Sequence, residues 1–137
     1  MSYLLDTNVL SETRKRRRDP GVTEWIAATP PERLYLSVLT VGEIEQGVAR
    51  LARRGDQEQA AAFESWLDGV LDAFEGRIFP VTVQIARQWG RTGAVRPVPV
   101  VNALIAATAR AYELTLVTRS TKDFEHADVR VMNPFSG

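Results

Sequence analysis

Three acidic residues of this 137-residue sequence stand where a parallel sheet would gather them. Asp6 follows a short apolar run, Glu43 falls in the first turn of a helix after a second run, and Asp123 follows a third. Ligand sites in open parallel sheets lie beyond the carboxyl ends of the strands, so the three carboxylates should meet there. Ionised carboxylates about 5 Å apart repel by roughly 3 kcal/mol per pair at an effective dielectric near 20. The cluster therefore needs a cation or a proton.

The donor atoms indicate which cation such a cluster would bind. The chain has no cysteine and one histidine, His126, so the candidate ligands are oxygen atoms. Oxygen ligands suit Mg²⁺ or Mn²⁺ and argue against zinc. A bound divalent ion lowers the pKa of a water ligand and stabilises charge on a phosphate, so phosphodiester hydrolysis is expected. A single histidine excludes a ribonuclease mechanism that needs two.

Strands and helices alternate along the chain and would position these residues. Apolar runs predict strands over 34–38, 78–79, 114–118 and 129–132 after a first strand over 3–5, and a short turn or helix over 120–124. Helical spacing and caps predict helices over 20–28, 40–51, 57–74, 82–91 and 100–112, with Pro97 and Pro99 bracketing the start of the last. We expect one domain over 1–137, a three-layer α/β/α fold with a central parallel sheet and a helical hairpin.

Composition narrows the class of protein but not its partner. No apolar stretch approaches the roughly 18 residues of a membrane span, and we expect no export leader, because Asp6 and Asn8 follow Met1 within a few residues. The absence of cysteine agrees with a reducing cytoplasm, where we expect the protein. Seventeen basic residues balance 17 acidic ones, so the net charge argues neither for nor against a nucleic-acid partner.

Four sequence blocks resemble the signature motifs of PIN-domain toxins, the ribonuclease half of VapBC toxin-antitoxin pairs. The blocks are LLDTNVLSE, TVGEIEQG, VVNALIAATA and TLVTRSTKDF, in the family's order and spacing. The resemblance implies a PIN-like fold and a metal-dependent endoribonuclease with acidic site residues Asp6, Glu43 and Asp123. It further implies Asn8 and Thr118 as polar support, and an RNA substrate, a cognate antitoxin and a homodimer.

The third block departs from the family pattern at Asn102, where the helix normally carries an aspartate. An amide carbonyl still binds Mg²⁺, so Asp6, Asn102 and Asp123 are the expected metal ligands and, with Glu43, the expected catalytic residues. Because an amide carries no charge, metal affinity and turnover should both fall. Such a near-isosteric change fits a natural variant and equally a substitution made to silence the enzyme. The alternative function is a weakened PIN module that binds RNA or antitoxin without efficient cleavage.

Each candidate also has a purely structural interpretation. Asp6 is typical of a turn or cap, and Asp123 of a cap. Thr40 and Glu43 match a capping box, in which the glutamate accepts a hydrogen bond from the N–H of the cap residue. Asn102 is also typical of a first helical turn. Only the joint occurrence of the four blocks favours a site.

One charge run and one further function class remain open. The run comprises Arg14, Lys15, Arg16, Arg17 and Arg18. It is either a solvated loop or a rim that holds RNA phosphates beside the acidic site. A phosphoacceptor signalling domain would also place acids at strand ends, but the strand over 78–79 ends in Pro80 rather than an acceptor aspartate. For the antitoxin we expect an arginine directed into the carboxylate pocket and a groove beside the hairpin over 40–74.

Overall fold

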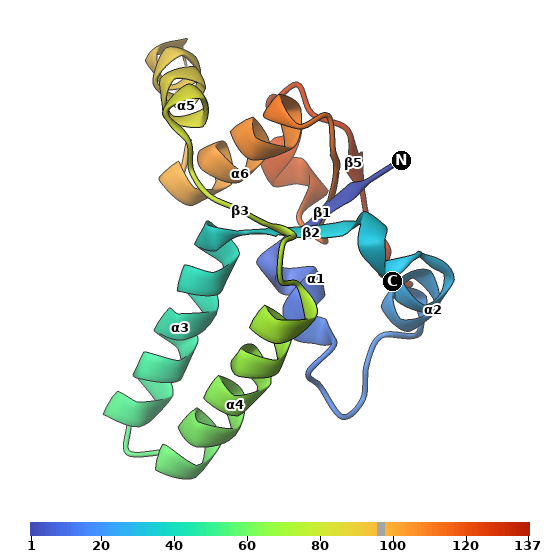
Figure 1. Cartoon of the computed structure of the whole chain (residues 1–137), viewed down its shortest axis with the longest axis vertical. Coiled ribbons are helices and arrows are strands. Elements are labelled where there is room, and N and C mark those ends of the chain that lie inside the picture. Colours follow the sequence, from blue (N-terminus) through green and yellow to red (C-terminus); the bar gives the residue numbers. More distant parts are fainter. Residues whose placement is uncertain (96–97) are drawn as a thin grey trace.

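A central sheet carries helices on both faces, and a long helical hairpin projects from one side of it (Figure 1). The structure is a computed structural model that describes residues 1–95 and 98–137. Within these ranges no helix is long and apolar enough to cross a membrane. Pro97, expected to bracket a helix start, lies outside the described residues.

The five strands are short and all parallel. They are β1 (Tyr3–Leu5), β2 (Leu34–Ser37), β3 (Ile78–Phe79), β4 (Thr115–Val117) and β5 (Val131–Met132), in the order β3-β2-β1-β4-β5. Leu4 of β1 pairs with Tyr35 on one side and with Leu116 on the other. The chain adds β2 and β3 on one side of β1 and then returns to add β4 and β5 on the other. The switch point of the sheet, where ligands bind in such folds, therefore lies between β1 and β4.

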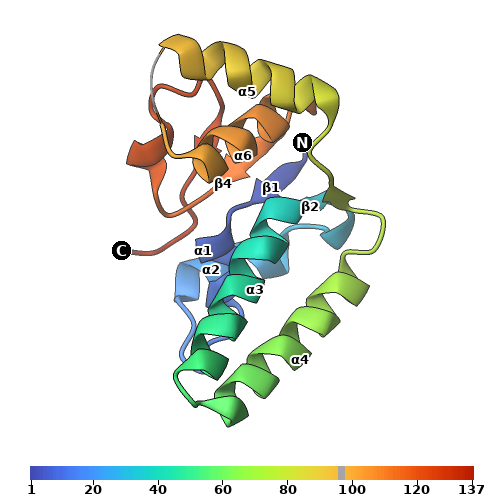
Figure 2. The ribbon, with the colours of Figure 1, turned by 90° about the vertical axis from the view of Figure 1, so that its left-hand side faces the viewer.

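Six α-helices and two short 3-10 turns connect the strands. The helices are α1 (Thr7–Glu12), α2 (Pro20–Ala28), α3 (Val38–Arg53), α4 (Gln57–Ala73), α5 (Val83–Val95) and α6 (Val100–Ala111); the turns are η1 (Pro31–Arg33) and η2 (Thr121–Phe124). The antiparallel pair α3 and α4 forms the predicted hairpin, and α5 packs along α6 on the opposite side of the sheet (Figure 2).

Two apolar cores flank the sheet because successive strand residues point to opposite faces. Leu5 and Val117 contribute to the core under α1, α2, α3 and α4. Their neighbours Leu4 and Leu116 contribute to the core under α6. This alternation gives the three layers and confirms the predicted α/β/α architecture.

Three local predictions were wrong at helix boundaries. The helix predicted from Thr40 begins at Val38, because Ser37 accepts a hydrogen bond from the N–H of Leu39 at 3.0 Å and caps it. The helix expected to end near residue 91 runs on through Gly93 to Val95, since packing on α6 outweighs the cost of roughly 1 kcal/mol for a glycine in a helix. The segment predicted as a turn after β1 continues into α1.

Candidate functional site

Asp6 joins the end of β1 to the start of α1 and is 7% exposed. Its Oδ1 accepts a hydrogen bond from the N–H of Thr7 at 2.8 Å, and its Oδ2 accepts one from the hydroxyl of Thr118 at 2.8 Å. Burial raises the pKa of Asp6 above its ordinary value; the two hydrogen bonds lower it, and the charge of Asp123 raises it further. Asp6 is thus a helix cap that still has lone pairs to offer a ligand.

The hydroxyl of Thr118, at the end of β4, has a fixed direction. It accepts hydrogen bonds from the N–H of Ser120 at 3.0 Å and from the amide of Asn8 at 3.4 Å. With both lone pairs used, its single hydrogen points to Asp6. The carbonyl of Asn8 accepts from the N–H of Arg119 at 3.1 Å. These bonds tie α1 to the segment after β4 across the switch point.

Glu43 lies in the second turn of α3, not in its first, because the helix starts at Val38. It therefore forms no capping box with Thr40. Its Oε1 accepts a hydrogen bond from the hydroxyl of Thr7. The hydroxyls of Thr7 and Thr40 lie 3.3 Å apart. Thr7 thus links Glu43 to Asp6, because its hydroxyl donates to one carboxylate and its N–H to the other. Sequence reasoning missed this role, although Thr7 belongs to the motif LLDTNVLSE.

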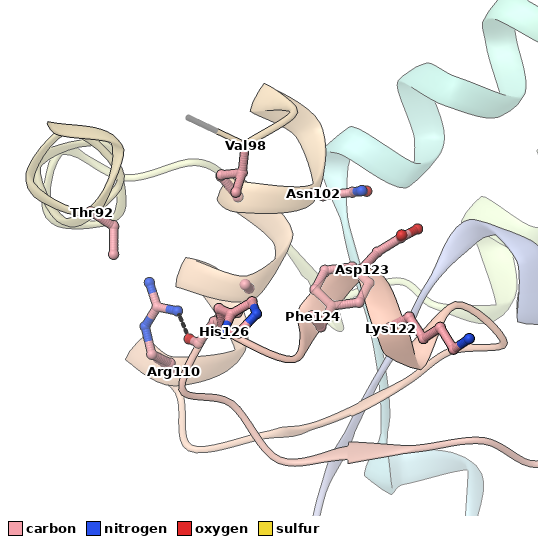
Figure 3. Close-up of a pocket in the computed structure, with 11 residues that line it drawn as sticks. Thr92, Val98, Asn102, Arg110, Lys122, Asp123, Phe124 and His126 are labelled. Carbon is pink, nitrogen blue, oxygen red and sulfur yellow. Dashed lines mark hydrogen bonds between the residues drawn. The ribbon is translucent and has the colours of Figure 1, made fainter. Parts of the chain in front are cut away.

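Asn102 and Asp123 line one cavity of about 310 Å³ between α6, η2 and α5. Asn102 is half-buried in the first turn of α6, and Asp123 is exposed on η2. Figure 3 shows both side chains at the same end of the cavity. The structure thus brings Asn102 to Asp123, Asp123 within electrostatic reach of Asp6, and Asp6 to Glu43 through Thr7.

The candidates meet in pairs rather than as a tight acidic cluster. Across residues 1–95 and 98–137, no three His, Cys, Asp or Glu side chains lie close enough to hold one metal ion together. Because the fourth candidate is Asn102, the oxygen donors around the switch point are carboxylates and one neutral amide.

The other end of the cavity carries a cation that sequence reasoning did not single out. Arg110 lies there beside His126, and its Nη1 donates to the carbonyl of Ala127, whereas Lys122 lines the cavity on the side of Asp123 (Figure 3). Burial lowers the pKa of Arg110 and nearby Asp128 raises it, but a guanidinium stays charged in proteins. The sequence did offer one indication that Arg110 belongs to this cavity: it follows Asn102 on the same predicted helix.

The basic run follows α1 and is exposed throughout. Lys15 pairs with Glu12 at 2.9 Å, Nε of Arg18 donates to the carbonyl of Lys15 at 3.1 Å, and the guanidinium of Arg14 stacks 4.0 Å over the ring of Phe63 on α4. Asp6 caps the other end of α1, which is about 9 Å long. The loop is therefore separated from Asp6 by the length of this helix.

Comparison with known proteins gives matches over nearly the whole chain. Residues 3–130 match the PIN domain family. The chain is 35% identical over 138 residues to toxin FitB of Neisseria gonorrhoeae, covering 96% of this chain and 97% of that protein. It is also 35% identical to a VapC ribonuclease of Sinorhizobium fredii, covering 96% of each.

Solved structures agree with the sequence matches. The crystal structure of FitAcB from Neisseria gonorrhoeae has a TM-score of 0.85 and 33% identity, covering 96% of this chain and 97% of that one. A toxin-antitoxin complex from Klebsiella pneumoniae has a TM-score of 0.69 and 25% identity, covering 98% of each. With the matched domain spanning nearly all of its residues, the chain belongs to the PIN domain family.

Proposed function

We propose that this protein is an Mg²⁺-dependent endoribonuclease toxin, with Mn²⁺ able to replace Mg²⁺, neutralised by a cognate antitoxin. The main observation in support of this proposal is that Asp6, Asn102 and Asp123 offer oxygen ligands around the switch point between β1 and β4. The names of its relatives, a VapC ribonuclease and toxin FitB, support the same class of activity.

The donor set fits Mg²⁺ better than any softer ion. Two carboxylates, Asp6 and Asp123, and the amide oxygen of Asn102 are hard ligands, and Mg²⁺ typically takes one or two carboxylates and keeps several waters. When bound, the ion would supply an activated water and stabilise charge on the phosphate. The hydroxyl of Thr118 and the N–H of Thr7 hold the Asp6 carboxylate in one orientation. Glu43, which accepts a hydrogen bond from Thr7, would accept a proton from the attacking water.

Asn102 supports a second candidate function. A neutral ligand leaves one charge fewer on the site than an aspartate would, so metal affinity and turnover should be lower. The chain would then hold RNA or antitoxin and cleave slowly. The distinction between a working nuclease and a weakened binding module rests on this one residue.

Replacing Asn102 with aspartate tests both candidates. We expect Asn102→Asp to raise Mg²⁺-dependent RNA cleavage by at least about tenfold, because the added charge attracts a divalent ion more than it repels single carboxylates. The metal-free variant should melt at a lower temperature than the parent, since repulsion among carboxylates rises by roughly 3 kcal/mol per pair at about 5 Å, and Mg²⁺ should reverse the difference. Unchanged cleavage together with an unchanged response to Mg²⁺ would remove position 102 from the site.

An apolar groove on the side of the sheet that carries α1, α2 and α4 supports the proposal of an antitoxin partner. It has a volume of about 510 Å³ and lies between α1, α2 and α4, so it borders only the α4 half of the hairpin. Leu10, Ile26 and Trp66 are among its lining residues. An amphipathic helix of the antitoxin would bury its apolar face there, and an arginine beyond it would reach the carboxylates. The toxin-antitoxin complex among the structural relatives supports such a partner.

Gly69 allows a sharp test of this groove. It lies on α4 against the groove, and an added Cβ would meet no atom within 4 Å. Gly69→Leu should therefore obstruct the groove while favouring the helix, since glycine costs roughly 1 kcal/mol in a helix interior. We expect the variant to lose co-purification with the antitoxin encoded beside it. Asp68→Leu, an exposed neighbour outside the groove, is the control and should keep binding.

The basic run and the homodimer are also part of this proposal. The exposed cations of residues 14–18 would hold RNA phosphates beyond the scissile one, because phosphate contacts position a nucleic acid without reading its sequence. We expect a cytoplasmic homodimer.

A further inference from the structure

The cavity beside Asn102 and Asp123 extends beyond the candidate metal ligands. It continues along α6, where Ala103 and Ala106 line it with small side chains, and Phe124 and Ala127 contribute from the η2 side. Its volume of about 310 Å³ lies at the lower end of the range for pockets that bind small organic ligands. The apolar part of this space adjoins Asn102 and Asp123, and it suits a flat, apolar-faced group attached to the substrate.

Arg110 places a donor-only group at the far end of this cavity. It lies eight residues after Asn102 on α6, about 12 Å along the helix axis. Side chains on a helix lean toward its N-terminus, so the guanidinium reaches back toward the site. One nitrogen donates to the carbonyl of Ala127, and Figure 3 shows another directed toward the side of Thr92 on α5. The guanidinium therefore keeps N–H groups for a ligand.

We propose that this cavity is a nucleobase subsite that takes a guanine next to the scissile phosphate. The inference rests on the proposed ribonuclease function. Guanine presents two adjacent acceptors, O6 and N7, which a guanidinium binds with two parallel hydrogen bonds. Adenine presents a donor beside N7, and Arg110 has no acceptor to receive it. The small side chains of Ala103 and Ala106 leave room for the ring, and the phosphate then lies toward Asn102 and Asp123.

The test uses the Asn102→Asp protein with Mg²⁺ and short uridine oligomers that carry one guanosine at successive positions. We expect cleavage efficiency to rise about tenfold or more when guanosine occupies one position beside the cut. Adenosine, an abasic ribose or 7-deazaguanosine, which lacks the N7 acceptor, should lose most of this gain. Cytidine, which also presents adjacent acceptors, measures how far the cavity selects by size. Cleavage that is indifferent to the base at every position would overturn the inference.

Two variants show whether the preference comes from this cavity. Ala103→Leu fills the space, and Arg110→Met keeps the length of the side chain but removes its donors. Each should bring cleavage of guanosine and adenosine oligomers to within about twofold of one another. Ala61→Leu on the exposed face of α4 is the control and should keep the preference. Melting temperatures check that both variants fold; a preference that survives in both folded variants would overturn the inference.

A binding measurement separates this inference from the proposed function. Guanosine 5′-monophosphate and uridine 5′-monophosphate are titrated into the chain as it stands and into its Ala103→Leu variant, without cleavage. Tighter binding of the guanosine nucleotide that Ala103→Leu abolishes would support the subsite even if no RNA is cut. RNA cleavage by Asn102→Asp without any such base preference would support the proposed ribonuclease function and overturn the guanine subsite.

Discussion

Asp6 shows how one buried carboxylate serves structure and chemistry at once. The same side chain caps α1 and receives the hydrogen of Thr118, so its position is fixed before any ligand arrives. Burial opposes its charge, and two hydrogen bonds support it. A carboxylate held in this way gains when a cation approaches, because the ion removes the electrostatic penalty of burial.

The pKa of Asp6 makes a prediction about stability. Its folded-state pKa is raised by burial, so the ionised form costs more in the folded protein than in the unfolded chain, and stability is lost as pH rises through that pKa. Asp6→Asn does not titrate. We therefore expect the free energy of unfolding of Asp6→Asn, relative to the parent, to increase as pH rises from about 4 toward neutrality in the absence of divalent ions. Urea unfolding at several pH values measures it.

Adding Mg²⁺ supplies the control for this prediction. The ion should raise the melting temperature of the parent more than that of Asp6→Asn, since only the parent keeps the carboxylate at this position. A relative stability that is flat with pH would contradict the assignment of a raised pKa to Asp6.

Residues at strand ends could be placed from the sequence, and those on helix interiors could not. Asp6 directly follows β1 and Asp123 lies shortly after β4, as the apolar runs before them predicted. Thr7 and Arg110 carried no such signal, because a threonine after a cap and an arginine late in an apolar helix are ordinary. Thr7 meets Glu43, which lies 36 residues away in the sequence, and Arg110 shares its cavity with residues of η2 and α5, so both roles depend on how separate elements pack.

Among the elements, α3 shows why a capping motif misplaced a helix start. Thr40 and Glu43 have the spacing of a capping box, yet Ser37 already caps the helix at the last residue of β2. The strand runs as far as Ser37, which pairs with Phe79, the last residue of β3. The helix is therefore capped by Ser37 and not by Thr40. Glu43 takes no part in capping and accepts a hydrogen bond from Thr7 instead.

Ser37→Ala tests this capping role. Removing the hydroxyl of the buried Ser37 leaves the N–H of Leu39 without its acceptor, so we expect the free energy of unfolding to fall by about 1 kcal/mol. Ser65→Ala, on the exposed face of α4, is the matched control and should change stability little. If Ser37→Ala is as stable as the control, the helix does not depend on this cap. Chemical denaturation of the three proteins gives the comparison.

For the molecule as a whole, the order of the strands was not predictable from their sequences. The five apolar runs indicated a parallel sheet with helices on both faces, and the structure confirms it. Which strands flank β1 depends on how the helices pack against the two cores that receive Leu4 and Leu5. The switch point, and with it the site, follows from that packing rather than from any single motif.

Exposed valines at the starts of α5 and α6 predict where the proposed homodimer forms its interface. Val83 is 77% exposed at the start of α5, and Val100 is 54% exposed at the start of α6, with Val81 and Val98 also exposed beside them. Val83 is a candidate for burial in the proposed homodimer interface, because an apolar side chain gains when it leaves water. In a twofold dimer each substitution occurs on both sides of the interface, so a charge introduced there weakens the association of the two subunits twice over.

We expect Val83→Asp to convert the proposed homodimer to a monomer at micromolar concentration. An aspartate at the first position of α5 is favourable to the helix, because the helix N-terminus attracts negative charge, so loss of the dimer would not come from unfolding. Val131→Asp on β5, another exposed valine at the edge of the sheet, is the control and should leave the dimer intact. Sedimentation velocity distinguishes the outcomes. A Val83→Asp protein that sediments like the parent would show that the proposed dimer forms through another face.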